Sequence, residues 1–400
     1  MIINPIVVFY ITSGLLIVGA LSLNAGNSSP PEVIWISMFV AALAVGNRLM
    51  PVRREKTFAT TKGLEIDIYC LSVLSLGAAL FALHGVPLLS PDPDIARMEF
   101  FADGGVLAKG FSLAPTVITI STIMIGGLRR RRAIAYGSLA GLEILLAGNK
   151  AALFNIALPV IIGFWCAGRR IPLRVLAVGG VIATALTIFL FATVANQSEV
   201  SESAWSLLLS RLTTTNASGL RLCLDYSGSI GTEPALIAFQ SLIDRLGGAM
   251  SGYPISTGRY LTTVYDNYSS FYDAVWELTV TGYCDSYLVG KTSGVIVYIA
   301  LMSTAIIWIL RRMASTTTVL GNAANTLALL HLFLIYNGGN IAAQLLGFIG
   351  QDWILFAALV LLAKLAARLI GSAASSLSAS SPIRFSDARD FRAVRRAGVD

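Results

Sequence analysis

The sequence predicts an all-α polytopic membrane protein with about 10 transmembrane helices and one large outer loop between helices 7 and 8. Hydrophobic residues make up 55% of its 400 residues, charged residues only 13%, and the mean hydropathy is +0.73. A soluble domain typically carries about 25% charged residues, and long stretches here carry none. This composition excludes a soluble enzyme with a conventional core, a disordered chain and a fibrous repeat.

The individual helices follow from the apolar stretches. A spanning helix needs about 20 mostly apolar residues at about 1.5 Å rise each. Ten stretches fit, at 6–23, 33–50, 67–89, 107–128, 133–149, 151–168, 174–195, 293–310, 319–337 and 352–370. The fifth and sixth are short, and only Gly148-Asn149-Lys150 separates them. We interpret these two as a tight hairpin, because a single helix of their combined length would overshoot a bilayer.

The basic residues orient the helices, because lysine and arginine gather in cytoplasmic connections. With the N-terminus inside, 21 of the 29 basic residues fall on the inner side and eight on the outer side. Five of these eight belong to one long loop, and long loops are largely exempt from the rule. Both termini are therefore expected in the cytoplasm. The first helix lacks the flanks of a signal peptide and is expected to be retained.

The chain divides into four parts. Their limits are 1–195 for helices 1–7 with an outer loop at 90–106, 196–292 for the large loop, 293–370 for helices 8–10, and 371–400 for a basic tail. The tail is expected to be disordered beside anionic headgroups. A structureless loop as long as the large one is unusual. The capping residues Thr232-Glu233-Pro234 and the apolar spacing after them predict an amphipathic helix at 233–246, and 204–212 is a second candidate.

Tyrosines gather in the second half of the large loop. Residues 253–287 hold seven of the 13, among them Tyr283 and Tyr287. Aromatic faces can stack on sugars, and the tyrosine hydroxyl can hydrogen-bond to them. An aromatic belt at the membrane interface or simple packing produces the same pattern, so both interpretations stay open.

Phosphate-binding and metal motifs are missing from the sequence. It has no Gly-rich phosphate loop and no His or Cys spacing typical of a metal site, so neither a cofactor nor a metal is expected. The only two histidines are His84 and His331, both in the outer halves of their helices. Cys223 and Cys284 share the oxidising side and could pair, although their spacing does not demand it.

Charges within or near the membrane are more informative, because they are costly there. Glu143 lies in mid-span and Lys150 at the outer turn of the hairpin. Five arginines add to the outer side: Arg97, Arg211, Arg221, Arg245 and Arg259. Such cations suit an anionic ligand such as a pyrophosphate. The alternatives are ion pairs within the loops and, for Glu143, a structural partnership with a basic residue.

Three segments resemble the Wzy-type O-antigen polymerases, a family of oligosaccharide repeat-unit polymerases. The run Gly85-Val86-Pro87-Leu88-Leu89, followed by Asp94, Arg97 and Glu99, resembles their first periplasmic-loop signature. Gly148-Asn149-Lys150 resembles the turn after their fifth helix, with lysine where arginine is usual. Residues 282–294 (GYCDSYLVGKTSG) resemble the acid, tyrosine and spaced glycines that lead into an outer helix start. The Arg-x10-Gly pattern of some members is absent.

The resemblance implies a metal-independent, inverting-type glycosyl transfer on a C-type glycosyltransferase architecture in the bacterial inner membrane, with the active site facing the periplasm. The donor would be a glycan on undecaprenyl pyrophosphate, and the acceptor a lipid-linked repeat unit. A chain-length regulator is a candidate partner, and no nucleic acid is expected.

Physical chemistry then assigns roles to residues. Without a metal, the leaving pyrophosphate needs fixed cations, for which the candidates are Arg97, Lys150, Arg211 and Arg221. Tyr283 and Tyr287 are candidate substrate contacts. The acceptor hydroxyl needs a general base, and Asp285, Glu277, Glu143 and His331 compete for that role. Asp285 is favoured because it lies in a matched segment.

Three other functions compete with a polymerase. An O-antigen ligase shares the chemistry but passes the glycan to the lipid A core. A transporter or flippase of lipid-linked sugars often shows inverted repeats, and the sequence shows no convincing one. A structural scaffold leaves Glu143 and the outer arginines unexplained. The gathering of acids and bases at the outer face favours an enzyme.

Overall fold

The structure is a computed structural model of the whole chain. The residues it describes are 4–23, 30–49, 63–108, 110–124, 128–148, 152–172, 174, 177, 181, 185, 216–230, 257–266, 280–339, 341–346 and 352–380. These residues form helices and the turns between them, and they contain no strand. The all-α class is therefore confirmed for the part of the chain that the structure describes.

Most of the long helices overlap the predicted apolar stretches, and shorter helices lie between those stretches. They are α1 (Ile6–Leu23), α2 (Pro31–Arg48), α3 (Gly63–His84), η1 (Pro87–Leu89), α4 (Pro93–Asp103), α5 (Gly105–Ala108), α6 (Gly110–Met124), α7 (Arg130–Leu146), α8 (Ala152–Cys166), α11 (Asn216–Ile230), α13 (Thr257–Asp266), α14 (Gly282–Ser315), α15 (Val319–Gly338), α16 (Ile341–Leu346) and α17 (Trp353–Ser380). Most of the predicted span 174–195, and the predicted loop helices 233–246 and 204–212, lie outside the described residues.

Five of the described helical segments are long and apolar enough to cross a membrane. They are Ile6–Leu23, Gly63–Leu89, Gly282–Ser315, Val319–Gly338 and Trp353–Ala373. Two shorter apolar helices, Leu113–Met124 and Ile156–Cys166, accompany them. These segments indicate a multi-pass membrane protein, while the count of ten spans stays a prediction.

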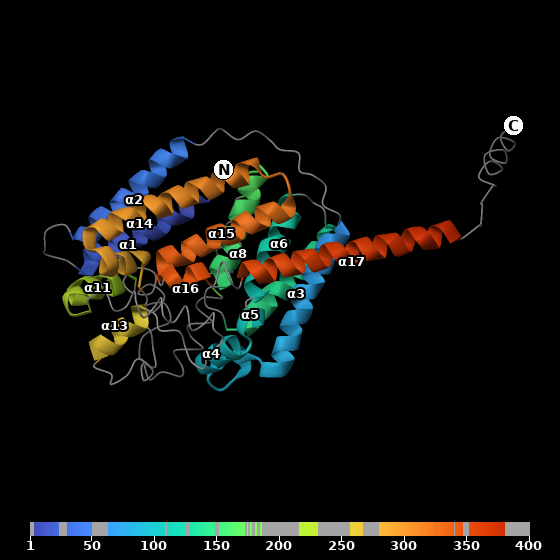
Figure 1. Ribbon diagram of the computed structural model, residues 1–400, viewed down its shortest axis with the longest axis horizontal. Coiled ribbons are helices and arrows are strands. Elements are labelled where there is room, and N and C mark those ends of the chain that lie inside the picture. Colours follow the sequence, from blue (N-terminus) through green and yellow to red (C-terminus); the bar gives the residue numbers. More distant parts are fainter. Residues whose placement is uncertain are drawn as a thin grey trace.

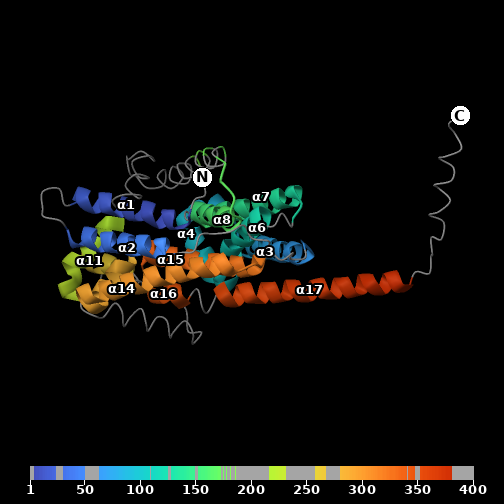
Figure 2. The ribbon, with the colours of Figure 1, turned by 90° about the horizontal axis from the view of Figure 1, so that it is seen from above.

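The helices pack in two neighbouring groups. In Figures 1 and 2, α1, α2, α14 and α15 lie side by side, and α3, α6, α7 and α8 form the second group beside them. An aromatic cluster fills the first group, where the rings of Phe39 and Tyr336 stack with centroids 4.8 Å apart. The Ser13 and Tyr336 hydroxyls lie 2.6 Å apart within it. Helix α17 packs along α3 and extends well beyond the bundle (Figure 1).

Two contacts join helix ends that the charge pattern assigns to the same side of the membrane. The Asn4 amide donates to Asn47 Oδ1 over 2.7 Å, joining the predicted inner ends of α1 and α2. Arg132 Nη1 donates to Asp67 Oδ2 over 2.7 Å, joining the predicted inner ends of α7 and α3. Ends assigned to one side thus meet in the structure, and the side on which they lie stays a prediction.

Helix α14 differs from the predicted span 293–310, because it begins earlier and folds back on itself. Lys291 breaks it with φ 52°, the left-handed region that favours glycine. A Cβ on Gly294 would collide with the Ser286 carbonyl oxygen, and one on Gly282 would collide with the Tyr298 ring. Contacts pairing 286 with 294 and 282 with 298 mean that residues 282–290 run antiparallel to the residues after the turn. We call this segment, 282–298, the α14 hairpin.

The C-terminal helix also exceeds the predicted span 352–370, because α17 continues to Ser380. Its last residues are mostly alanine and serine, and alanine is the strongest helix former. The remainder of the predicted tail, 381–400, lies outside the described residues.

Candidate functional site

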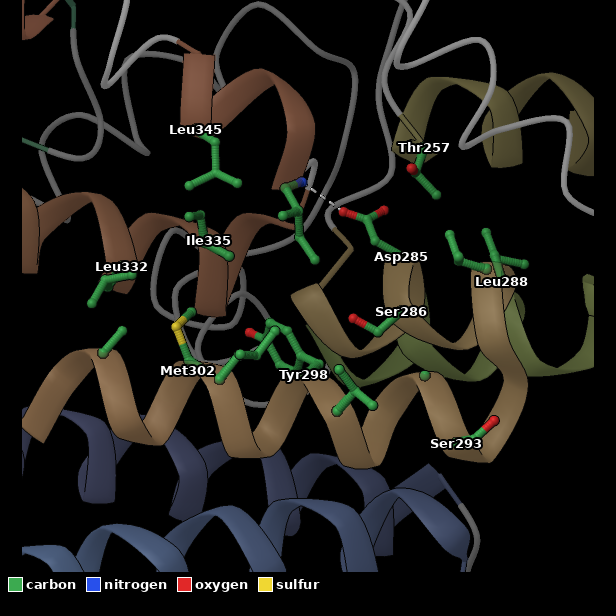
Figure 3. Close-up of a pocket in the computed structure, with 16 residues that line it drawn as sticks. Thr257, Asp285, Ser286, Leu288, Ser293, Tyr298, Met302, Leu332, Ile335 and Leu345 are labelled. Carbon is green, nitrogen blue, oxygen red and sulfur yellow. Dashed lines mark hydrogen bonds between the residues drawn. The ribbon is translucent and has the colours of Figure 1, made fainter.

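A groove of about 730 Å³ lies between the α14 hairpin, α15 and α16. This volume is in the range of small-molecule sites, about 300–1,000 Å³. Figure 3 shows the labelled side chains Thr257, Asp285, Ser286 and Ser293 toward one end of the groove. Leu332 and Leu345 lie toward the other end, whereas Leu288 lies among the polar side chains (Figure 3). The polar side chains of the groove therefore gather toward one end.

The wall of the groove includes apolar side chains that protein does not cover. Val297 is 55% exposed and Leu301 is 67% exposed, and both lie on the long arm of α14, which is the part that follows the turn at Lys291. This arm belongs to a segment apolar enough to cross a membrane. Exposed apolar surface of this kind is stable against lipid rather than water. The groove is thus open toward the region where lipid chains would lie.

Asp285 is the acidic residue on this wall, and it is half-buried. The Ile341 N–H donates to its Oδ2 over 2.8 Å, linking the α14 hairpin to the first residue of α16. A carboxylate has about four lone-pair positions on its two oxygens. The hydrogen bond from Ile341 therefore helps to orient the carboxylate on the groove wall.

The part of the α14 hairpin before the turn, residues 282–290, is its short arm, and this arm is attached to α11. Cys223 and Cys284 form a disulfide with their Cα atoms 5.8 Å apart. At the turn, Lys291 Nζ donates to the Ser227 carbonyl oxygen over 3.3 Å and lies 5.2 Å from the centre of the Tyr287 ring. The pairing that the sequence left open is therefore present in the structure.

Arg221 on α11 contacts carboxylates. Its Nη1 lies 3.8 Å from Glu32 Oε1, and its Nε donates to Asp225 Oδ2 over 3.2 Å. Glu32 lies in the first turn of α2 and is only 1% exposed. The structure thus shows the ion-pair alternative for Arg221, and its binding of pyrophosphate stays a prediction.

Arg97 packs against the turn between α7 and α8. Asp92 caps its helix by accepting from the Ile95 N–H over 3.1 Å. A Cβ on Gly148, which has φ +68°, would lie 3.7–3.8 Å from the side-chain carbons of Arg97. The structure therefore brings Arg97 to the turn that carries Lys150, although Lys150 itself lies outside the described residues.

Glu143 lies on α7, near this turn. Its Oε2 is buried and has no hydrogen-bond partner among the described residues. The described residues show no basic partner for Glu143, which a purely structural role would need. Its role as a base stays a prediction.

His331 forms a buried pair with a residue that the sequence did not single out. Its Nε2 lies 2.8 Å from Asp352 Oδ2, with side-chain exposures of 8% and 5%. The neighbouring Leu332 and Ile335 line the groove, whereas His331 does not. An acid next to an apolar span is expensive and often functional, and that signal could have identified Asp352.

The two candidate tyrosines take part in packing. Tyr283 is fully buried, with its ring 5.3 Å from that of Tyr298. Tyr287 is half-buried, and its ring lies 5.4 Å from that of Trp35. The packing alternative thus describes the positions of both side chains, and sugar contacts stay a prediction.

Two further candidates, Glu277 and Arg211, lie outside the described residues. The described side chains contain no group of three or more His, Cys, Asp or Glu residues that could hold a metal ion.

No protein-family model, no curated protein and no solved structure matches the chain. A functional proposal therefore rests on the residues and on the groove they form.

Proposed function

We propose that the protein is a polymerase of undecaprenyl-pyrophosphate-linked repeat units in surface polysaccharide synthesis. It transfers the growing glycan to a new lipid-linked unit, without a metal or cofactor. In this proposal about ten helices span the bacterial inner membrane, both termini are cytoplasmic and the groove opens toward the periplasm.

The observation that supports this proposal best is the groove with Asp285 on its wall. A polyprenyl chain is apolar and needs a lipid-accessible surface, which Val297 and Leu301 provide. The sugar needs hydrogen-bonding groups, and the hairpin end of the groove supplies a carboxylate and hydroxyls. One groove can thus hold the lipid chain and the sugar, while the pyrophosphate needs cations from outside the groove lining.

The chemistry assigns Asp285 as the general base. Its carboxylate takes the proton from the acceptor hydroxyl as that oxygen attacks the anomeric carbon of the donor. The bond from the anomeric carbon to the pyrophosphate oxygen breaks, and the lipid pyrophosphate leaves with the electron pair. Fixed cations stabilise the negative charge that develops on it. The candidates are Arg97, which packs against the turn between α7 and α8, and Lys150, which the sequence assigns to that turn.

Deletion of the gene in its host tests the proposal. Loss of a polymerase leaves single repeat units attached to the acceptor, which a gel of surface polysaccharide shows as a short band. Loss of a ligase or of a flippase leaves none, so that outcome would favour one of these alternatives. Unchanged polysaccharide would contradict the proposal for that glycan.

Point variants in the deletion strain test the residues. Asp285→Asn and Arg97→Ala are expected to abolish chain extension while the protein still inserts. Asp103→Asn is the matched control, because Asp103 is an exposed acid at the end of α4 on the same predicted side. If Asp285→Asn and Arg97→Ala extend chains normally, the assignment of these residues is wrong.

A further inference from the structure

The short arm of the α14 hairpin is attached to α11 at both of its ends. Cys284 joins Cys223 through the disulfide, and Lys291 reaches the carbonyl of Ser227. Cys223 and Ser227 are four residues apart, so they lie one above the other on the same face of α11. The arm is therefore anchored along one face of α11.

Asp285 directly follows the disulfide-bonded Cys284. Consecutive residues of an α-helix point about 100° apart. The same turn of helix can thus face α11 with its cysteine and face the groove with its carboxylate, where the Ile341 N–H contacts it. The position of the carboxylate is tied to the attachment of the arm.

The non-covalent attachment of the arm to α11 is weaker than the disulfide. The Lys291 hydrogen bond is long, at 3.3 Å, and its partner is a neutral carbonyl. Lys291 is also the only non-glycine residue with positive φ among the described residues. Such a conformation disfavours the turn for any residue but glycine. Nothing in the turn itself therefore replaces the covalent link.

We propose that the Cys223–Cys284 disulfide is a positioning element for Asp285, and that glycan transfer depends on its oxidation. This inference rests on the proposed function. When the disulfide forms, the two thiols lose two protons and two electrons to the disulfide of a thiol–disulfide exchange protein, which becomes a dithiol. Reduction reverses the step, releases the arm from α11 and lets the Asp285 carboxylate shift away from the groove wall, while the packing of Tyr283 keeps the rest of the arm in place.

Hydrogen exchange at Ile341 reports the position of Asp285 independently of the reaction. Ile341 is the first residue of α16, and the first N–H groups of a helix have no partner within the helix. Its protection against exchange therefore depends on the Asp285 carboxylate. The experiment uses the full-length protein in lipid nanodiscs, oxidised or reduced with dithiothreitol, and measures exchange in the peptide that contains Ile341.

Reduction is expected to speed exchange at Ile341 by about tenfold or more, because its hydrogen bond to Asp285 can then open without unfolding of the whole protein. Exchange within α15 is expected to stay unchanged, which separates repositioning from unfolding. Chain extension on a lipid-linked repeat unit is expected to fall by about a hundredfold, as for a misplaced catalytic group, and reoxidation is expected to restore both.

Two variants complete the design. Cys223→Ser is expected to behave as the reduced protein does and to be insensitive to dithiothreitol. Cys70→Ser, which changes a buried free thiol elsewhere, is expected to keep the redox sensitivity of the original chain. If Cys223→Ser does not accumulate, the comparison of the oxidised and the reduced original protein, which is already folded, tests the inference by itself.

Equal exchange at Ile341 in the oxidised and reduced protein overturns the inference, whatever happens to chain extension. Faster exchange with undiminished extension also overturns it. If reduction speeds exchange but the oxidised protein extends no chain, the positioning of Asp285 by the disulfide stands and the proposed function fails.

Discussion

The tight turn of the α14 hairpin makes one glycine indispensable and leaves a neighbouring one replaceable. A Cβ on Gly294 would meet the carbonyl oxygen and carbonyl carbon of Ser286, which are backbone atoms that cannot rotate away. A Cβ on Gly290 has nothing within 4 Å. Gly294→Ala should therefore force the hairpin open, whereas Gly290→Ala should fit without a change.

The size of the effect follows from these contacts. Forcing extra atoms into a packed position costs about 1–3 kcal/mol. In a helix, alanine gains up to about 1 kcal/mol over glycine, and this gain applies to both variants. The Gly294→Ala variant should thus be less stable than Gly290→Ala by about 1–3 kcal/mol.

Thermal unfolding of the detergent-solubilised protein, followed by tryptophan fluorescence, measures the difference. Gly294→Ala should unfold at a lower temperature and extend chains more slowly, because the hairpin carries Asp285. Gly290→Ala should match or exceed the original protein in stability. Equal unfolding temperatures for the two variants would refute the back-folded geometry of α14.

Three further substitutions test other contacts. Asp352→Ala removes the carboxylate beside buried His331 Nε2 and should destabilise the protein by about 1–3 kcal/mol; an unchanged unfolding temperature would argue against the pair. Gly148→Ala should cost about 1–2 kcal/mol, because its φ of +68° is left-handed. Gly141→Ala inside α7, where a Cβ has nothing within 4 Å, is its control and should match or exceed the original protein in stability; equal stability of the two variants would contradict the turn geometry. Arg221→Ala leaves a buried carboxylate on α2 without its cation and should cost about 1–3 kcal/mol. Unfolding at the original temperature would show that this ion pair contributes nothing.

The helices were the predictable part of the fold, because an apolar stretch of spanning length forms a helix whatever surrounds it. The predicted spans 6–23 and 319–337 agree with α1 and α15 within one residue at each end. Among the described helices, α17 runs past its predicted span, and the α14 hairpin begins before its own and changes the direction of the chain at Lys291. Its turn depends on close backbone approaches at Gly282 and Gly294, which tertiary packing creates and which composition does not reveal.

The candidate site was predictable only in part. Asp285 stood out because it lies in a segment that resembles a family signature, and the structure places it on the groove wall. Asp352 was missed, because 20 residues separate it from His331 in the sequence and only the folded bundle brings them together. Arg221 looked like a ligand cation, but its partner Glu32 lies on a helix far away in the chain.

We propose that Asp285 in this groove serves glycan transfer between lipid-linked units. The most direct measurement supplies the purified protein in nanodiscs with an undecaprenyl-pyrophosphate-linked repeat unit, in the presence of a metal chelator, and separates the products by length. The proposal predicts a ladder of extended glycans from the original protein and only the single unit from Asp285→Asn. No ladder from the original protein, or the same ladder from both, would contradict it.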